Sequence, residues 1–108
     1  MHAGKLDKKI IIQVRTLSQD ASGQPNETWS TFAIVYANIK PLVGKDLLEA
    51  NQLVNQISHD VTIRYRRGIK AKMRISYLDR YFEIASPPID PNESREWLYL
   101  KCKEVEED

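Results

Sequence analysis

The chain has little cysteine, histidine or glycine, and each scarcity excludes a class of site. Its 108 residues include one cysteine, Cys102, which rules out an internal disulfide and a cysteine zinc cluster. The two histidines, His2 and His59, lack the spacing of metal ligands. The four glycines are far apart, so no glycine-rich phosphate loop is present. We therefore expect no catalytic residues, no metal site, no cofactor and no enzymatic activity.

Long apolar runs are also missing. No stretch approaches the roughly 18 apolar residues that would cross a bilayer, and the N-terminus lacks the apolar region of a signal peptide. We therefore expect no membrane contact and synthesis in a reducing cytoplasm. Cys102 alternates with Leu98 and Leu100, which predicts a buried small hydrophobe. The alternative, a Cys102–His59 dyad, lacks a neighbouring cation or helix N-terminus that would activate the thiol.

The overall charge is close to neutral, but it is unevenly distributed. The net charge is +1, and 42% hydrophobic and 29% charged residues are ordinary for a soluble protein. We expect one domain over residues 1–108, with residues 1–4 and 105–108 frayed. Basic residues gather between Arg64 and Arg80, whereas the last five residues are mostly acidic. Such polarity suits head-to-tail contact between neighbouring molecules as well as it suits a basic ligand site.

Period-two alternation of apolar and polar residues predicts a mainly β protein. Strands are expected over residues 6–16, 29–39, 60–66, 72–77 and 97–103, with a short run at 82–84. Residues 59–84 are interpreted as a three-stranded meander with a basic outward face. Residues 29–39 are apolar on both faces, which predicts a strand covered on both sides. We expect a small antiparallel β-barrel of about six strands, with one short helix or loop inserted near residues 44–58.

The insert has the pattern of a helix over residues 46–57. Asp46 followed by Glu49 resembles a capping box, and the apolar stripe of Leu47, Val54 and Ile57 follows at helical spacing. Leu48 and Leu53 give this helix a second apolar edge. The helix either plugs an open end of the barrel or protrudes to meet another subunit.

The basic face allows three interpretations. Arginines interleaved with Tyr65, Tyr77 and Tyr81 are compatible with an oligonucleotide-binding surface on a small barrel. They are equally compatible with a subunit interface or with a solvated strand face, because Tyr65 and Tyr77 are in phase with the core positions. Residue types and spacing leave these alternatives open.

Short segments along nearly the whole chain occur in the order typical of one known family. They are residues 4–6 with 10–13, Asp20, Gly23 and Trp29, residues 36–42 with Gly44, residues 59–65 with 68–69, residues 73–75, 81–84 and 90–91, and residues 97–102. On these segments the chain resembles the head-closure, or head–tail joining (stopper), proteins of long-tailed bacteriophages and prophages. In that family the turn before Arg80 usually carries glycine, whereas here it is Leu78-Asp79.

The resemblance implies a structural virion protein that completes the phage head. Copies of the chain would form a ring under the portal and adaptor, help to retain packaged DNA, and present the surface on which the tail-completion protein docks. DNA would pass through the channel without sequence-specific binding. The protein would be made in the bacterial cytoplasm and end in the virion.

The resemblance also suggests which residues make the contacts. The candidates for subunit or adaptor contacts are Arg64, Arg66, Arg74 and Arg80. The candidates in the insert, which would face the channel or a neighbouring subunit, are Lys45, Leu47, Leu48, Leu53 and Val54. The alternatives are a small barrel that binds single-stranded nucleic acid, and another connector or tail-completion component.

Overall fold

Six antiparallel strands account for about half of the chain in the computed structural model, which describes residues 6–19, 21–45, 47–48 and 57–106. No helix within these segments is long and apolar enough to cross a membrane. The one helix with described bounds is a 3-10 turn, η1 (Pro91–Glu93). The strands are β1 (Lys8–Gln19), β2 (Pro25–Pro41), β3 (His59–Arg64), β4 (Arg74–Tyr77), β5 (Arg80–Ile84) and β6 (Trp97–Val105).

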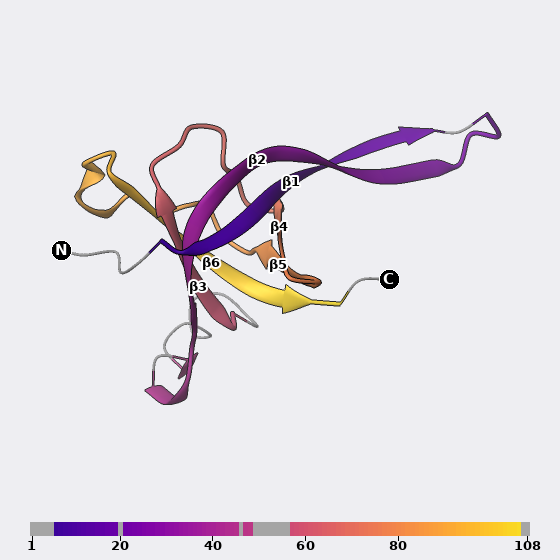
Figure 1. The fold of residues 1–108 in the computed structure, drawn as a ribbon. Helices are drawn as coiled ribbons and strands as arrows, with labels where there is room; N and C mark the ends of the chain where they lie inside the picture. Colours follow the sequence, from indigo (N-terminus) through magenta and orange to yellow (C-terminus); the bar gives the residue numbers. More distant parts are fainter. Residues whose placement is uncertain (1–5, 20, 46, 49–56, 107–108) are drawn as a thin grey trace.

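The six strands form one sheet that closes into a ring in the order β1-β2-β3-β6-β5-β4 (Figure 1). The closing contact is short, because β4 pairs with β1 only from Ile11–Ser76 to Gln13–Arg74. The β1–β2 ladder, by contrast, runs the full length of β1. The prediction of a mainly β protein with six antiparallel strands is confirmed. The ring is too uneven in strand length to be a regular barrel.

The predicted three-stranded meander is wrong. β4 and β5 form a hairpin, but β3 pairs with β2 and β6 and does not contact β4 as a strand. β6 instead lies between β3 and β5, where Cys102 is the partner of both His59 and Ile84. Residues 65–73 therefore form a connection across the sheet and not a tight turn.

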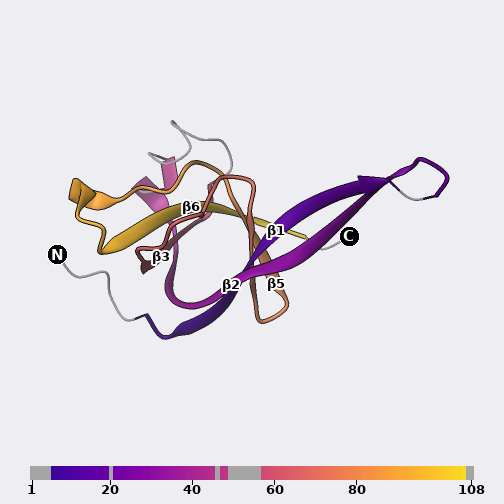
Figure 2. The same ribbon diagram turned by 90° about the horizontal axis from the view of Figure 1, so that it is seen from above.

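A two-stranded arm projects from the closed part of the sheet. Among the described residues, β1 beyond Gln13 pairs only with β2, and β2 before Ala37 pairs only with β1. We call the free part of this hairpin, residues 14–31, the arm; it lies far to one side in both views (Figures 1 and 2). It gives the molecule dimensions of 52 × 27 × 26 Å. The register shifts at the base of the arm, between Ile12 and Gln13.

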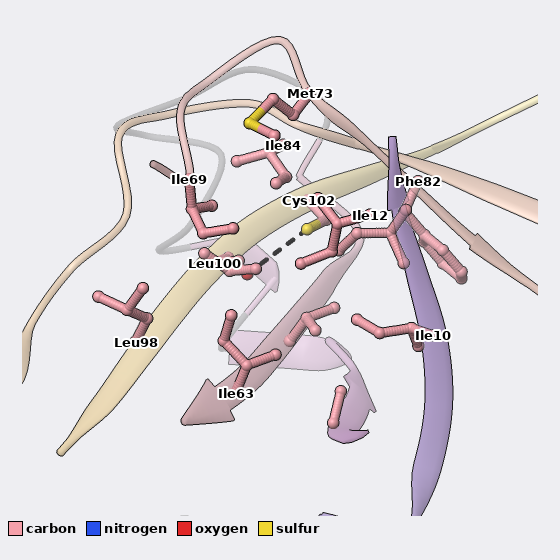
Figure 3. Packing of buried hydrophobic residues seen from close by; sticks show 13 residues of the cluster. Ile10, Ile12, Ile63, Ile69, Met73, Phe82, Ile84, Leu98, Leu100 and Cys102 are labelled. Carbon is pink, nitrogen blue, oxygen red and sulfur yellow. Dashed lines mark hydrogen bonds between the residues drawn. The ribbon is translucent and has the colours of Figure 1, made fainter. Parts of the chain in front are cut away.

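The core lies inside the closed part of the sheet and is built by the inward-facing residues of all six strands (Figure 3). Cys102 is fully buried among them, and its thiol donates to the Leu100 carbonyl at 3.6 Å. The prediction of a buried small hydrophobe at Cys102 is confirmed. Tyr65 and Tyr77 pack against the core as partly buried residues, in the phase that the sequence predicts.

The prediction that residues 29–39 are covered on both faces is wrong for the single chain. Ala33 and Ala37 face the core, but Phe32, Ile34 and Tyr36 on the other face are 37%, 56% and 58% exposed. Phe32 is partly covered by the connection after β3, through Gly68 and Arg66, whereas the described residues leave Ile34 and Tyr36 more than half exposed. Ile34 and Tyr36 therefore form an apolar surface that the described part of the chain leaves largely uncovered.

The insert is anchored where it leaves and rejoins the sheet. The Leu42 N–H donates to the Ser58 carbonyl, and the Ser58 N–H donates to the Cys102 carbonyl, both at 2.9 Å. The predicted helix falls mainly on residues 46 and 49–56, which lie outside the described residues, as do the candidates Leu53 and Val54. Of the other candidates, Lys45 and Leu48 are exposed and Leu47 is half-buried.

Candidate interaction surface

An open groove lies at the end of the molecule opposite the arm. It has a volume of about 590 Å³, and we call it the end groove. Its lining residues come from the segment just before β1, from the middle of β2, from the end of β3 with the two residues after it, and from the start of β6. The starts of β1 and β6 lie away from the arm (Figure 2). The lining residues are Leu6, Val35, Tyr36, Arg64, Tyr65, Arg66 and Trp97.

Arg64 and Arg66 are held at the end groove by aromatic rings. Arg64 is the cross-strand partner of Trp97, and its guanidinium carbon lies 5.2 Å from the indole centroid. The Arg66 guanidinium lies 5.8 Å from the ring of Phe32. Both arginines are exposed, and within the described residues neither forms an ion pair with a carboxylate. Stacking orients a guanidinium while its N–H donors remain directed outward, ready for an acceptor on another molecule.

Arg74 is engaged inside the chain, away from the end groove. Its guanidinium lies 4.2 Å from the ring of Trp29 and 4.3 Å from that of Tyr81. Its Nε donates to the Gln13 side-chain oxygen at 2.8 Å. These contacts join the base of the arm to the β4–β5 hairpin.

Arg80 forms an ion pair within the same chain. Its Nε and an NH2 nitrogen donate to the two Glu104 carboxylate oxygens at 2.9 and 3.0 Å. The hydrogen bond from Arg80 lowers the pKa of Glu104. Both side chains are well exposed, so this pair contributes little to stability. Part of the basic cluster and part of the acidic C-terminus, which the sequence suggests as partners between molecules, thus already meet within one molecule.

His59 is the buried polar residue of this region. Its Nδ1 lies 2.8 Å from the Ser58 hydroxyl, its Nε2 lies 3.4 Å from the Arg80 guanidinium, and its ring packs edge-on against Phe82. An Arg80 donor facing Nε2 fits the tautomer in which Nδ1 carries the proton and donates to Ser58. Burial lowers the pKa of His59, and the facing Arg80 adds to this effect against the opposing Glu104.

Cys102 and His59 are cross-strand partners, but they do not form a catalytic dyad, because Cys102 does not supply a thiolate nucleophile. Burial raises the pKa of the Cys102 thiol, which therefore stays protonated. The imidazole of His59 is occupied by Ser58 and Arg80. Within the described segments, no group of three or more His, Cys, Asp or Glu side chains is arranged to hold a metal ion.

Of the four candidate arginines, the structure thus brings together Arg64 and Arg66 and places Arg74 and Arg80 elsewhere. The aromatic and apolar residues around these two arginines, chiefly Tyr36, Trp97 and Leu6, were not predicted as contacts. The signal for Tyr36 was visible in residues 29–39, where apolar side chains occupy both faces of one strand. It was interpreted as internal burial and not as a surface for a partner.

The comparisons with known proteins decide the family. The model of the phage head completion protein family matches residues 1–105. The chain belongs to this family.

Individual relatives agree with that assignment. Head completion protein gp7 of Enterobacteria phage HK97 is 29% identical, over 95% of this chain and 96% of its own length. The solution structure of protein SF1141 from Shigella flexneri 2a matches with a TM-score of 0.81 at 26% identity, over the whole of both chains. A chain in the virion of a native gene transfer agent particle shares the fold, with a TM-score of 0.62 at 15% identity over 94% and 96% of the two chains. Membership of the family implies a structural role in phage head completion and not an enzymatic one.

Proposed function

We propose that this head completion protein forms a ring under the portal and adaptor, helps to retain the packaged DNA, and offers the surface on which the tail-completion protein docks. The observation that carries the proposal is the uncovered face of β2 beside two stacked arginines. Apolar and aromatic residues rimmed by arginine are the composition of protein–protein interfaces. An apolar surface of this kind that stays exposed in the single chain is typical of a site that binds another protein.

Arg64 and Arg66 are the proposed contacts to a neighbouring subunit or to the adaptor. Their stacked guanidinium groups are already oriented, so little side-chain entropy is lost when an acceptor binds. Arg74 and Arg80 stay in the proposal as secondary contacts, because each already has partners within its own chain. Lys45, Leu47 and Leu48 of the insert, with Leu53 and Val54, are proposed to face the channel or the adjacent subunit.

DNA is proposed to pass through the ring without being held by base contacts. The net charge of +1 gives a weak overall attraction to phosphate. In the proposed channel-facing insert, residues 44–58, the charged residues are Lys45, Asp46 and Glu49, so the lining would be close to neutral. Tight, salt-sensitive binding to DNA phosphates would slow the later release of DNA through the channel.

The test uses packaged heads assembled without this protein. Purified protein is added, and the fraction of packaged DNA that survives nuclease is measured over time. We expect protection to rise when the protein joins the heads, whereas protection that stays at the level without protein would contradict DNA retention. Oligonucleotide binding is measured in parallel at two salt concentrations, because submicromolar affinity with a steep salt dependence would favour the nucleic-acid-binding alternative.

A further inference from the structure

We propose that the arm of one copy docks in the end groove of the next copy, so that the ring is joined head to tail. This inference rests on the proposed ring and names the two surfaces that form it. The starts of β1 and β6, beside which the end groove lies, are at the end of the molecule away from the arm (Figures 1 and 2). Two different surfaces that bind each other make a heterologous contact, and such contacts close into rings when the rotation fits.

The arm is not expected to be stable in water by itself. An isolated two-stranded hairpin is marginal, and no strand in the described part of the chain pairs with the outer edge of either arm strand. Its described residues, 14–19 and 21–31, are almost all exposed. Leu17, at 63% exposure, places a large apolar side chain in solvent. These features are typical of a segment that becomes buried when a partner binds.

The dimensions of the molecule suit a second copy as that partner. The long axis of 52 Å is nearly twice the 26–27 Å of the other two. The paired segment from Val14–Ser30 to Gln19–Pro25 comprises six residue pairs, or about 20 Å of strand. The arm therefore reaches most of the way across the body of an adjacent copy.

The chemistry of the two surfaces is complementary. The end groove is lined by aromatic and aliphatic side chains and by two arginines, and none of its described lining residues is a carboxylate. The charged residues of the arm are Arg15, Asp20 and Glu27, and Arg15 and Glu27 face each other at 3.8 Å. An arm with so few charges loses little hydration energy when it enters an aromatic groove. Its edge carbonyls are the acceptors that Arg64 and Arg66 need, and Leu17 is suited to contact Trp97 or Tyr36.

Disulfide cross-linking in assembled particles tests this contact. The double variant carries Leu17→Cys on the arm and Tyr36→Cys in the end groove. These positions lie roughly eight residue pairs apart along the hairpin, about 25 Å, which is too far for a bond within one chain. The native Cys102 is buried and does not compete. Packaged heads that contain the variant are oxidised, purified and run on a non-reducing gel.

We expect a ladder of dimers, trimers and larger products from the double variant, and no ladder from either single variant. A mixture of the two single variants should give dimers only. The control pair, Leu17→Cys with Leu78→Cys, places the second thiol at a similarly exposed position on the β4–β5 turn and should give no ladder. Leu6→Cys replaces Tyr36→Cys as a second groove position, in case the loss of Tyr36 itself weakens docking.

Each outcome separates this inference from the proposed function. Variant protein that is present in the heads, but gives no ladder from either groove position, would overturn the arm contact and leave the head-completion role intact. A product that joins Leu17→Cys to a different virion protein would overturn it as well, because the arm would then bind that protein. Folded protein that fails to join the heads at all would count against the proposed function, and the arm contact would fall with it.

Discussion

Phe32 lies directly against Gly68, so closely that a Cβ atom at Gly68 would be 2.7 Å from the Phe32 Cζ. Phe32 stands on β2 at the base of the arm, and Gly68 lies in the connection between β3 and β4. Gly68 also has a φ of +93°, which non-glycine residues rarely adopt. The pair joins the base of the arm to the connection that carries Arg66 and Arg67.

Gly68→Ala is therefore expected to lower the free energy of unfolding by about 1–3 kcal/mol, from backbone strain and from displacement of the Phe32 ring. Gly23→Ala is the matched control, because Gly23 has a similar φ of +84° but open space around it. Urea unfolding of both variants separates backbone strain from displacement of the Phe32 ring. Gly68→Ala should lose more unfolding free energy than Gly23→Ala. Adding Phe32→Ala should remove the extra cost of Gly68→Ala. Equal losses in the two glycine variants would show that the Phe32 contact is unimportant.

Leu78 and Asp79 form the two-residue turn between β4 and β5, and both have positive φ, 46° and 63°. Asparagine tolerates this conformation far better than leucine does. Leu78→Asn should therefore raise the free energy of unfolding by about 0.5–1 kcal/mol. Leu78→Ala, which removes the exposed side chain but keeps the strain, is the comparison. If Leu78→Ala raises the free energy of unfolding as much as Leu78→Asn does, the cause is the removal of an exposed apolar side chain and not the relief of backbone strain.

His59 predicts a pH dependence of stability. Its pKa in the folded protein is below the ordinary value of 6.5, so the unfolded chain binds the proton more readily. The stability that this residue contributes is fully present above pH 6.5 and is lost as the pH falls through the lower, folded pKa. Glu104, whose pKa is also lowered, acts in the same direction but only below its ordinary value of 4.5.

The measurement is the urea midpoint of unfolding between pH 7.5 and pH 5. In the native protein, we expect the urea concentration at the midpoint to decrease as the pH is lowered below 6.5. In His59→Gln this decrease should be much smaller. Glu104→Gln, in which His59 is retained, is the control and should keep a decline that begins near pH 6.5. A native midpoint independent of pH over this range would refute the burial of a neutral His59.

Arg64→Glu combined with Arg66→Glu should leave the fold intact and abolish attachment to the capsid vertex. Both side chains are exposed, so the loss of unfolding free energy should be about 1 kcal/mol or less, mostly from the stacking on Trp97 and Phe32. Attachment is measured as the amount of protein that sediments with packaged heads. The control, Lys70→Glu with Lys72→Glu, changes the net charge equally at exposed positions outside the end groove. Attachment of the folded arginine variant at the native level would refute the interface assignment.

Much of the local structure could be predicted from the sequence, because alternation reports which face of a strand is buried. The strand positions and the burial of Cys102 were obtained in this way. Alternation does not report which strands are neighbours. The meander prediction therefore failed: β6, from the far end of the sequence, lies between β3 and β5.

The candidate surface was predicted only in part for the same reason. The run of arginines was visible in the sequence, but the partner of each arginine depends on strand register. Register places Trp97 beside Arg64, and Arg80 meets Glu104 only because the start of β5 is paired with the end of β6. The arm was missed because residues 18–28 are almost all polar, so no alternation of apolar side chains marks the outer parts of its two strands.

The most direct measurement is a complementation test on a virus that lacks this reading frame. Purified protein is mixed with tailless, packaged heads of that virus and with free tails, and the infectious particles are counted. The proposed role predicts that infectivity returns and that the protein is found at a single capsid vertex. A folded protein that joins no vertex and restores no infectivity would contradict head completion and tail joining by this chain.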